Sequence, residues 1–195
     1  MFFLNFEGPT ISAGAVDDAR IDQTAVLSVA QDYQPYGDAG DEALLLGLVQ
    51  EDFAAVNVLV TDERPDSGDY TMVVVSPSNP FGAAVLTYSS GVDCTNANPN
   101  NVVFAFFGTA TTLPPTSQAN LISSIIGISL GFERITNEAA NDVMYQYVQG
   151  ADASFVDACL DLREAVPVQC PVQHEIHCPE GQQNSHAELT AFFSD

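Results

Sequence analysis

The residues of this chain best suited to metal chemistry are three histidines near its C-terminus. His174 and His177 lie three residues apart, and His186 follows them. Imidazole nitrogens are frequent zinc ligands, so a zinc site made from two or three of these side chains would suit a hydrolase. The first two histidines, however, lie between Cys170 and Cys178, where a disulfide would close a tight loop. Polar side chains on the surface of such a loop are therefore the preferred interpretation, and a metal site is the alternative.

Carboxylates are the second group of potential ligands. The chain contains 26 Asp and Glu residues, and several of them are adjacent in the sequence. Calcium prefers oxygen ligands, but no segment has the DxDxDG spacing of a calcium loop. A solvated acidic surface is the preferred interpretation, and one weak calcium site is the alternative. The residues concerned are Asp17, Asp18, Asp38, Asp41, Glu42, Asp62, Glu63, Asp66 and Asp69.

A third pattern, Gly127-x-Ser129-x-Gly131, has the outline of a serine nucleophile elbow. That elbow requires a sharp turn between a strand and a helix, where the serine hydroxyl is exposed. Here the pattern falls inside an expected helix. Serine catalysis is therefore not predicted, and Gly131 is interpreted as a residue that lets the chain bend.

The elements that must position these residues include both strands and helices. A helix is predicted at 41–56, where apolar residues recur at helical spacing, and another at 118–132, after a proline-rich start. The unbroken apolar run 102–107 is typical of a strand buried on both faces. Further strands are expected at 2–6, 56–61, 70–75 and, at an edge, 83–88, and further helices at about 153–163 and 185–193. Together they predict an α/β (α+β) fold in one domain.

The helix at 118–132 is followed by a glycine break at Gly131 and then by a polar bend that contains Met144. Metzincin zinc proteases have a zinc-binding helix, a glycine bend and a methionine turn in this order. The chain resembles the metzincin clan, and it looks most like bacterial secreted metalloprotease-like proteins. The resemblance covers most of the chain, through the segments 2–8, 49–65, 67–75, 93–107 and 182–185.

The segment SIIGISLGFER, residues 124–134, contains the positions that matter for catalysis. The resemblance places the three zinc histidines at Ser124, Ile128 and Arg134, and the general-base glutamate at Ile125. Isoleucine offers a metal no lone pair, arginine is a permanent cation, and an isolated serine hydroxyl is a poor zinc ligand. Isoleucine cannot take a proton from water. The resemblance therefore implies a degenerate site without zinc, without another cofactor and without catalysis; a core helix similar to the clan by chance is the alternative.

The resemblance also implies an architecture. Residues 1–195 would form a single metzincin-like domain. Residues 1–134 would contain a mixed, mostly parallel twisted sheet and two main helices, and residues 135–195 would contain the methionine turn and a disulfide-bonded, cysteine-rich subdomain.

The cysteines indicate an oxidising compartment. Cys94, Cys159, Cys170 and Cys178 are even in number and have no CxxC spacing, so two disulfides are predicted. A short Cys170–Cys178 loop would leave Cys94 to pair with Cys159, but all three connectivities stay open. The start MFFLNFEG is typical of a strand and not of a signal peptide. We therefore expect a secreted or periplasmic protein from which an export signal has been removed.

The charge of the chain restricts its partners. Four arginines and no lysine stand against 26 acidic residues, which gives a net charge of −22. Such a chain repels phosphate backbones and anionic lipid, so neither nucleic-acid binding nor membrane insertion is expected. A halophilic-type acidic surface, suited to a salty medium, is the preferred interpretation of this charge.

The leading hypothesis is a secreted, catalytically inactive metzincin-like pseudoprotease that binds an unknown protein or peptide partner. Its former cleft, or the edge strand at 83–88, would receive the partner. Arg134 would pair with a carboxylate there, or else with Glu133 or a nearby aspartate. Two alternatives stay open: a hydrolase (peptidase) that uses the C-terminal histidines or an unrecognised site, and an acidic structural or assembly subunit.

Overall fold

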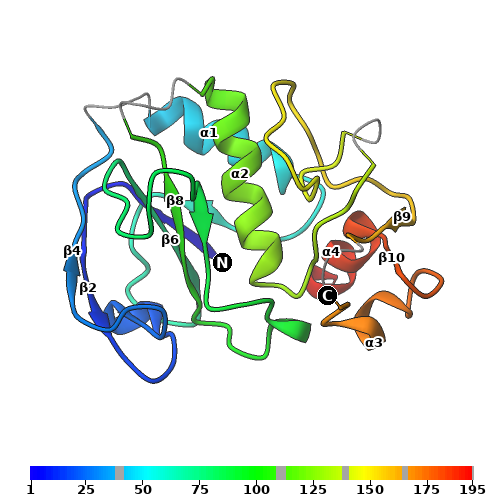
Figure 1. Cartoon of the computed structure of the whole chain (residues 1–195), viewed down its shortest axis with the longest axis horizontal. Coiled ribbons are helices and arrows are strands. Elements are labelled where there is room, and N and C mark those ends of the chain that lie inside the picture. The colour runs from blue at the N-terminus through cyan, green and yellow to red at the C-terminus, as the bar shows by residue number, and fades with distance from the viewer. Residues whose placement is uncertain (38–41, 109–112, 138–140, 164–166, 195) are drawn as a thin grey trace.

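A five-stranded sheet forms the centre of the computed structural model, which describes residues 1–37, 42–108, 113–137, 141–163 and 167–194 (Figure 1). The strand order is β5-β1-β6-β8-β7. Strands β5, β1, β6 and β8 are parallel, and β7 pairs antiparallel with β8 at the edge. The expected mixed, mostly parallel sheet is thus confirmed. The strands are β1 (Phe2–Asn5), β5 (Val60–Thr61), β6 (Thr71–Ser76), β7 (Thr87–Tyr88) and β8 (Val102–Phe106).

Both faces of this sheet are buried, which explains the unbroken apolar runs of its strands. Successive side chains of a strand point to opposite faces. In β6, Val73 and Val75 belong to the core beneath the helices, whereas Met72 and Val74 belong to a second core on the other face. The prediction of a doubly buried strand near 102–107 is confirmed, because every residue of β8 is buried.

The helical face of the sheet is covered by α1 (Glu42–Asp52) and α2 (Pro115–Ile128), which pack against each other (Figure 1). Both were predicted, with somewhat different ends. Asp41, in the expected first turn of α1, lies outside the described residues. Helix α2 begins at Pro115 because proline suits the first turn of a helix, where its missing N–H costs nothing.

The other face of the sheet is covered by a small second sheet near the N-terminus. Strands β3 (Gln23–Thr24), β2 (Thr10–Ala13) and β4 (Gln31–Asp32) form a small three-stranded sheet in that order. A short 3-10 helix, Ala19–Ile21, lies between β2 and β3. Ile11, Ala19 and Tyr33 contribute to the second core, so this segment buries the face of the main sheet opposite the helices.

The C-terminal part of the chain contains short elements. They are β9 (Leu160–Asp161), α3 (Pro171–His174), β10 (Gln182–Gln183) and α4 (Ser185–Phe193). The helix predicted at 185–193 is confirmed, and the Asn184 side chain caps it by accepting the Ala187 N–H at 2.8 Å. The two main helices that were expected are α1 and α2, and the described residues also contain α4 and the single-turn α3.

The helix predicted at 153–163 is wrong. The backbone of this segment bonds to other parts of the chain: the N–H of Val143 bonds to Ser154 O at 3.0 Å, and that of Leu162 bonds to Gly181 O at 2.9 Å. β9 pairs with β10. The strand expected at 56–61 is also shorter, because Val56 and Val58 make local turn hydrogen bonds before β5 begins.

The disulfides join Cys94 to Cys170 and Cys159 to Cys178. The short Cys170–Cys178 loop considered from the sequence is therefore wrong, because these two cysteines bond to separate segments. Cys94–Cys170 connects the loop before β8 to the start of α3. Two disulfides are compatible with an extracellular location. Across the described residues, no helix is long and apolar enough to cross a bilayer.

One buried carboxylate connects the two main helices. Asp52, the last residue of α1, accepts a hydrogen bond from the Ser123 hydroxyl on α2. Burial raises the pKa of Asp52 to about 7, although the Ser123 hydrogen bond opposes that shift. A carboxyl group whose pKa is raised by folding destabilises the native state increasingly as the pH rises from its ordinary value toward the raised one.

We therefore expect Asp52→Asn to stabilise the protein at pH values above 7, by roughly 1–3 kcal/mol. The effect should disappear near pH 4, where Asp52 is protonated in the folded protein. Urea unfolding at several pH values measures it. Asp66→Asn, which removes the same charge from an exposed turn, is the control and should change stability little. A variant Asp52→Asn that is less stable than the wild type above pH 7 would contradict the expectation.

Candidate functional site

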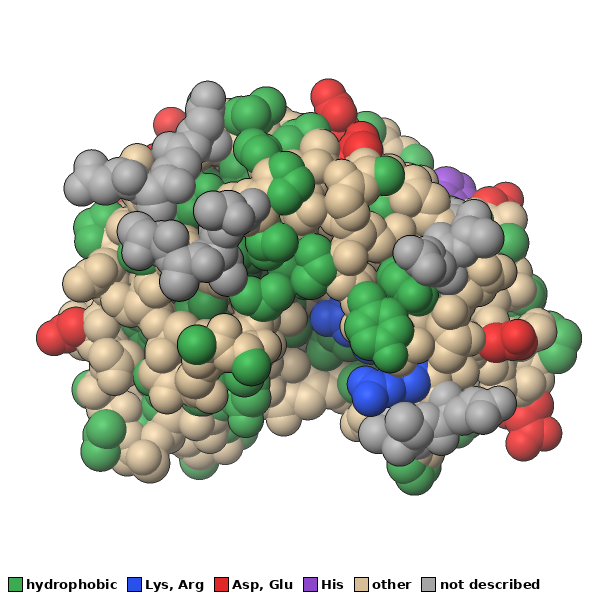
Figure 2. Space-filling model, turned by 45° about the horizontal axis from the view of Figure 1, so that its top comes forward, with side chains coloured by type: hydrophobic (Ala, Val, Ile, Leu, Met, Phe, Trp, Pro, Cys, Tyr) green, Lys and Arg blue, Asp and Glu red, His purple; other side chains and the backbone are tan. Residues whose placement is uncertain are grey.

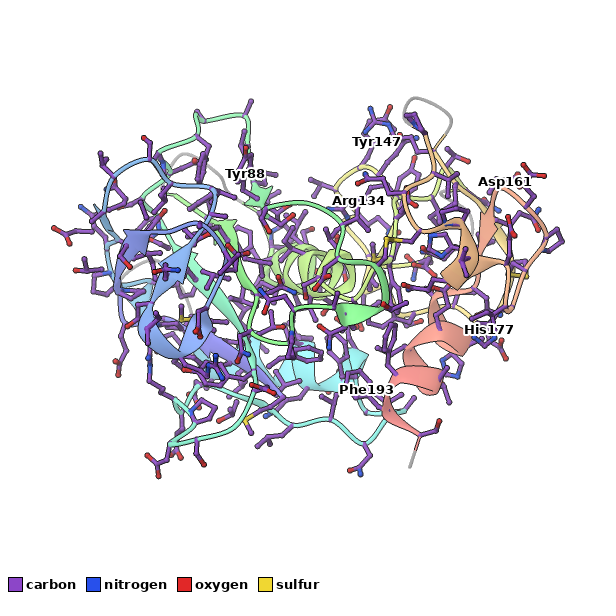
Figure 3. All side chains as sticks on the ribbon, turned by 90° about the horizontal axis from the view of Figure 1, so that it is seen from below. Tyr88, Arg134, Tyr147, Asp161, His177 and Phe193 are labelled. Atoms are coloured by element: carbon purple, nitrogen blue, oxygen red, sulfur yellow. A yellow bond between two sulfur atoms is a disulfide. The ribbon has the colours of Figure 1, made fainter. Side chains whose placement is uncertain are left out.

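A hollow on the surface lies where the edge strand, α2 and the C-terminal part of the chain meet. Figure 2 shows it with hydrophobic side chains around it and arginine atoms at its base. In Figure 3, Tyr88 of β7 lies on one side and Tyr147 on the other, with Arg134 between them in this view. Both tyrosines are exposed, by 38% and 66%. The hollow thus presents aromatic side chains, a free sheet edge and a positive charge together.

Helix α2 contains two of the positions that the predicted resemblance assigns to zinc ligands, Ser124 and Ile128. Ser124 and Ile125 are buried, and Ile128 is 9% exposed. Arg134 donates a hydrogen bond from Nη1 to Ser124 Oγ. The structure therefore brings two of the three positions that the resemblance assigns to zinc ligands into direct contact, with Ile128 one helical turn beyond Ser124. Arg134, at the third of these positions, is a cation, and its side chain reaches Ser124 at the first position.

Gly131 follows the end of α2, in agreement with its interpretation as a residue that lets the chain bend. Its φ is +91°, in the region that favours glycine. A Cβ at this position would lie 2.3 Å from Gln173 Oε1 and 3.0 Å from Cys94 Cα, so the chain bends against two neighbouring segments. Ser129, the serine of the elbow-like pattern, is buried at the end of α2 and donates to Ile126 O at 2.7 Å.

The bend that contains Met144 lies directly against α2. Met144 is fully buried, and a Cβ at Gly127 would lie 2.6 Å from its sulfur. The Asp142 carboxylate holds the turn: it accepts the N–H groups of Met144 at 2.7 Å and Val156 at 2.9 Å. It also accepts the hydroxyl of Ser185 at the start of α4. Residues 142–144 therefore tie the end of α2 to the C-terminal helix.

Arg134 is partly buried, and the sequence left its partner open. Burial, together with the positive charge of Arg163, lowers the pKa of its guanidinium to about 10. Arg134 nevertheless stays charged at neutral pH. Among the described residues, no carboxylate oxygen lies within 4.0 Å of Arg134. The sequence did not single out Arg163, although the scarcity of basic residues was a signal.

Glu133 points away from Arg134 into a buried cluster with His174. The Glu133 carboxylate accepts the N–H groups of Gln169 at 2.7 Å and Cys170 at 3.0 Å, and it lies 3.3 Å from His174 Nε2. On its other side, His174 Nδ1 lies 3.0 Å from a carboxylate oxygen of Glu188. The expectation that His174 is a surface residue is wrong, because folding buries it between two carboxylates.

This cluster keeps His174 charged. Burial disfavours the imidazolium, but hydrogen bonds to Glu133 and Glu188 outweigh burial and raise the pKa of His174 to about 9. Burial likewise disfavours ionised Glu133, yet the hydrogen bonds from His174, Cys170 and Gln169 outweigh it and lower the pKa of Glu133. The three side chains form a structural ion cluster in which both ring nitrogens of His174 face carboxylates.

The other candidate metal ligands are separated. His177 is exposed and His186 lies on α4, so neither joins His174. No group of three or more His, Cys, Asp or Glu side chains in the described part of the chain is arranged to hold a metal ion. Of the acidic residues, Asp17 accepts from Thr24, Ala25 and Ser90, and Asp18 pairs with Arg20. Asp38 and Asp41 lie outside the described residues.

Gly131→Ala should destabilise the protein by roughly 2 kcal/mol or more, because the new methyl group meets Gln173 and the backbone of Cys94 at a positive φ. Gly47→Ala is the matched control. Gly47 lies in the interior of α1, and a Cβ there would have open space around it, so alanine should stabilise by roughly 0.5–1 kcal/mol. Denaturant unfolding compares the two, and equal effects would contradict the role of Gly131.

The His174 cluster predicts a loss of stability in alkaline solution. Protonated His174 stabilises the folded state fully below pH 6.5, its ordinary pKa, and this contribution is lost as the pH rises through about 9. Over that range the free energy of unfolding should fall by roughly 2–3 kcal/mol. His177→Gln, on the surface, should leave the profile unchanged, and His174→Gln should flatten it. A wild-type profile without this fall would contradict the cluster.

Comparison of the chain with protein-family models, with curated proteins and with solved structures finds no match. The mixed α/β fold with two disulfides is established by the structure itself. The resemblance to metzincins stays a prediction from the sequence.

Proposed function

We propose that the protein is a non-catalytic, metzincin-like binding domain that receives a peptide segment in the hollow beside β7. The observation that supports it most is the contact between Arg134 and Ser124. If the resemblance holds, a guanidinium occupies the region of the zinc ion in an active protease. Ile125, which follows Ser124 in the sequence, would stand at the general-base position and has no group to activate water.

The edge strand supports binding of an extended segment. β7 pairs with β8 through one edge, and among the described residues no further strand pairs with its other edge. Unpaired N–H and C=O groups at a sheet edge can add a peptide strand. A depression of about 230 Å³ lies next to this strand and is lined in part by Pro77, Val85, Leu86 and Phe106. It would accommodate an apolar side chain of the bound segment.

No specific observation favours either of the two alternative functions. In a hydrolase built on the C-terminal histidines, His174 would be a poor ligand, because both of its ring nitrogens face carboxylates. An acidic assembly subunit is consistent with the charge, but no described surface singles out a partner copy. A secreted location is compatible with the two disulfides and is part of the proposal.

Restoring the zinc motif tests the proposal most directly. The fourfold variant Ser124→His, Ile125→Glu, Ile128→His and Arg134→His should acquire one tightly bound zinc ion, measured by metal analysis after zinc equilibration and desalting. The wild type should hold no stoichiometric zinc and should not cleave unstructured casein. The physical reason is that only the variant offers three imidazoles at the positions that the resemblance assigns to zinc ligands.

A threefold variant that keeps Ile128 is the control, because it lacks one ligand and should bind zinc much more weakly. Circular dichroism in the near ultraviolet establishes that each variant is folded. Stoichiometric zinc in the wild type, or casein cleavage that chelation abolishes, would sink the proposal. A folded fourfold variant without zinc would show that the assignment of positions from the resemblance is wrong.

A further inference from the structure

The four arginines of the chain fall into two groups. Arg20 pairs with Asp18 at 2.9 Å and with Asp69 at 3.3 Å, and Arg64 pairs with Asp22. These partners are expected where 26 acidic residues surround four cations. Arg134 and Arg163 differ, because no carboxylate of the described residues lies within ion-pair distance of either.

The two arginines without a carboxylate are neighbours. The N–H of Arg163 donates to the carbonyl oxygen of Arg134 at 2.8 Å, and an antiparallel bridge joins the adjacent residues Ile135 and Leu162. The side chains are close enough for the charge of Arg163 to disfavour the charge of Arg134. Two like charges held together cost free energy unless an anion lies between or beside them.

Ser124 holds the Arg134 side chain in place but accepts only one of its hydrogen-bond donors. A guanidinium has five N–H donors in a planar fork. Ser124 accepts one of them, and the structure gives the others no partner among the described residues. Glu133, the nearest acidic residue in the sequence, accepts instead from His174 and from two backbone N–H groups on the other side of the chain. In the described part of the chain these donors face no carboxylate, and we expect a group that enters the hollow to meet them.

We infer that Arg134 and Arg163 form a recognition site for a carboxylate of the bound peptide, either its C-terminal group or an Asp or Glu side chain. The inference rests on the proposed binding function and gives it a chemical specificity. Arg134 supplies a fixed, partly desolvated fork that matches a carboxylate in two parallel hydrogen bonds. Arg163 is exposed and adds a second positive charge beside Arg134.

The surroundings restrict which carboxylate binds. A net charge of −22 repels a free anion at a distance, so a carboxylate needs further contacts to remain in the hollow. Tyr88 and Tyr147 on its sides offer aromatic surface to an apolar side chain, and the edge of β7 offers backbone hydrogen bonds. A peptide that presents a carboxylate next to an aromatic residue can contact the arginines, the two tyrosines and the edge of β7 together.

Arginine NMR offers a direct test, because the chain has four arginines and no lysine. Arg→Gln variants assign the four Nε–Hε signals of the uniformly ¹⁵N-labelled protein. Three probes are then titrated: the peptide acetyl-Ala-Phe-Ala-Leu-Ala with a free C-terminus, the same peptide amidated, and an amidated form with Glu in place of the central Ala. The free acid or the Glu peptide should shift the Arg134 signal and bind about tenfold tighter than the amidated parent.

Variants separate the site from its surroundings. Arg134→Gln should remove the preference for the carboxylate peptide, and Arg134→Lys should retain part of it because the charge remains without the fork. Arg20→Gln, which disrupts ion pairs elsewhere, is the control and should leave the preference unchanged. Whichever of the two carboxylate peptides shifts Arg134 more identifies the source of the group.

The failure of this inference differs from the failure of the proposed function. Equal affinity of acid and amide peptides, with the Arg134 signal unmoved, would overturn the carboxylate site and leave the binding function standing. Arg134 signals unmoved by every probe and by sodium acetate would likewise overturn the inference. The binding function itself fails independently if the wild type holds stoichiometric zinc or cleaves casein.

Discussion

The reversal of the chain at Gly131 is the constraint on which both the hollow and the C-terminal part depend. At φ +91° the chain leaves α2 and turns back along it. Two residues later Glu133 enters the buried cluster, and the next residue, Arg134, returns to Ser124. Adjacent side chains of an extended segment point in opposite directions, so one bend supplies a structural carboxylate to one side and a cation to the other.

The C-terminal part is held together by polar interactions more than by a sheet. Its strands β9 and β10 have two residues each, too few to bury much apolar surface. Instead, His174 lies between Glu133 and Glu188, and the Asp142 carboxylate gathers three donors. Buried charges are tolerated when they are paired and hydrogen-bonded, and removing one partner is costly. The two disulfides add covalent connections to this region.

The chain as a whole is strongly acidic, with a net charge of −22, whereas two of its four arginines meet beside the hollow without a described carboxylate. A fixed guanidinium can orient an anionic group, but it has neither the lone pair of a metal ligand nor a proton-accepting site. These properties support the proposed recognition function, and Arg134 and its neighbours are the side chains on which that proposal depends.

The main strands and helices followed from local patterns, because apolar periodicity and proline position depend on neighbouring residues. For that reason the sheet strands, α1, α2, α4 and the bend at Gly131 were predictable. The irregular structure of residues 153–163 was not predictable, because the backbone hydrogen bonds of this segment go to residues distant in the chain. The cysteine pairing was open for the same reason, as four cysteines allow three connectivities.

By itself, the sequence determined which side chains α2 carries, and so which chemistry Ser124, Ile125 and Ile128 can perform. Only the tertiary structure decided the partners of Arg134 and His174. A histidine between two cysteines looks like a surface residue until Glu133 and Glu188, remote in the chain, surround it. Likewise, the role proposed for Arg163 depends on its position beside Arg134, because the charge that a side chain experiences depends on its neighbours in space.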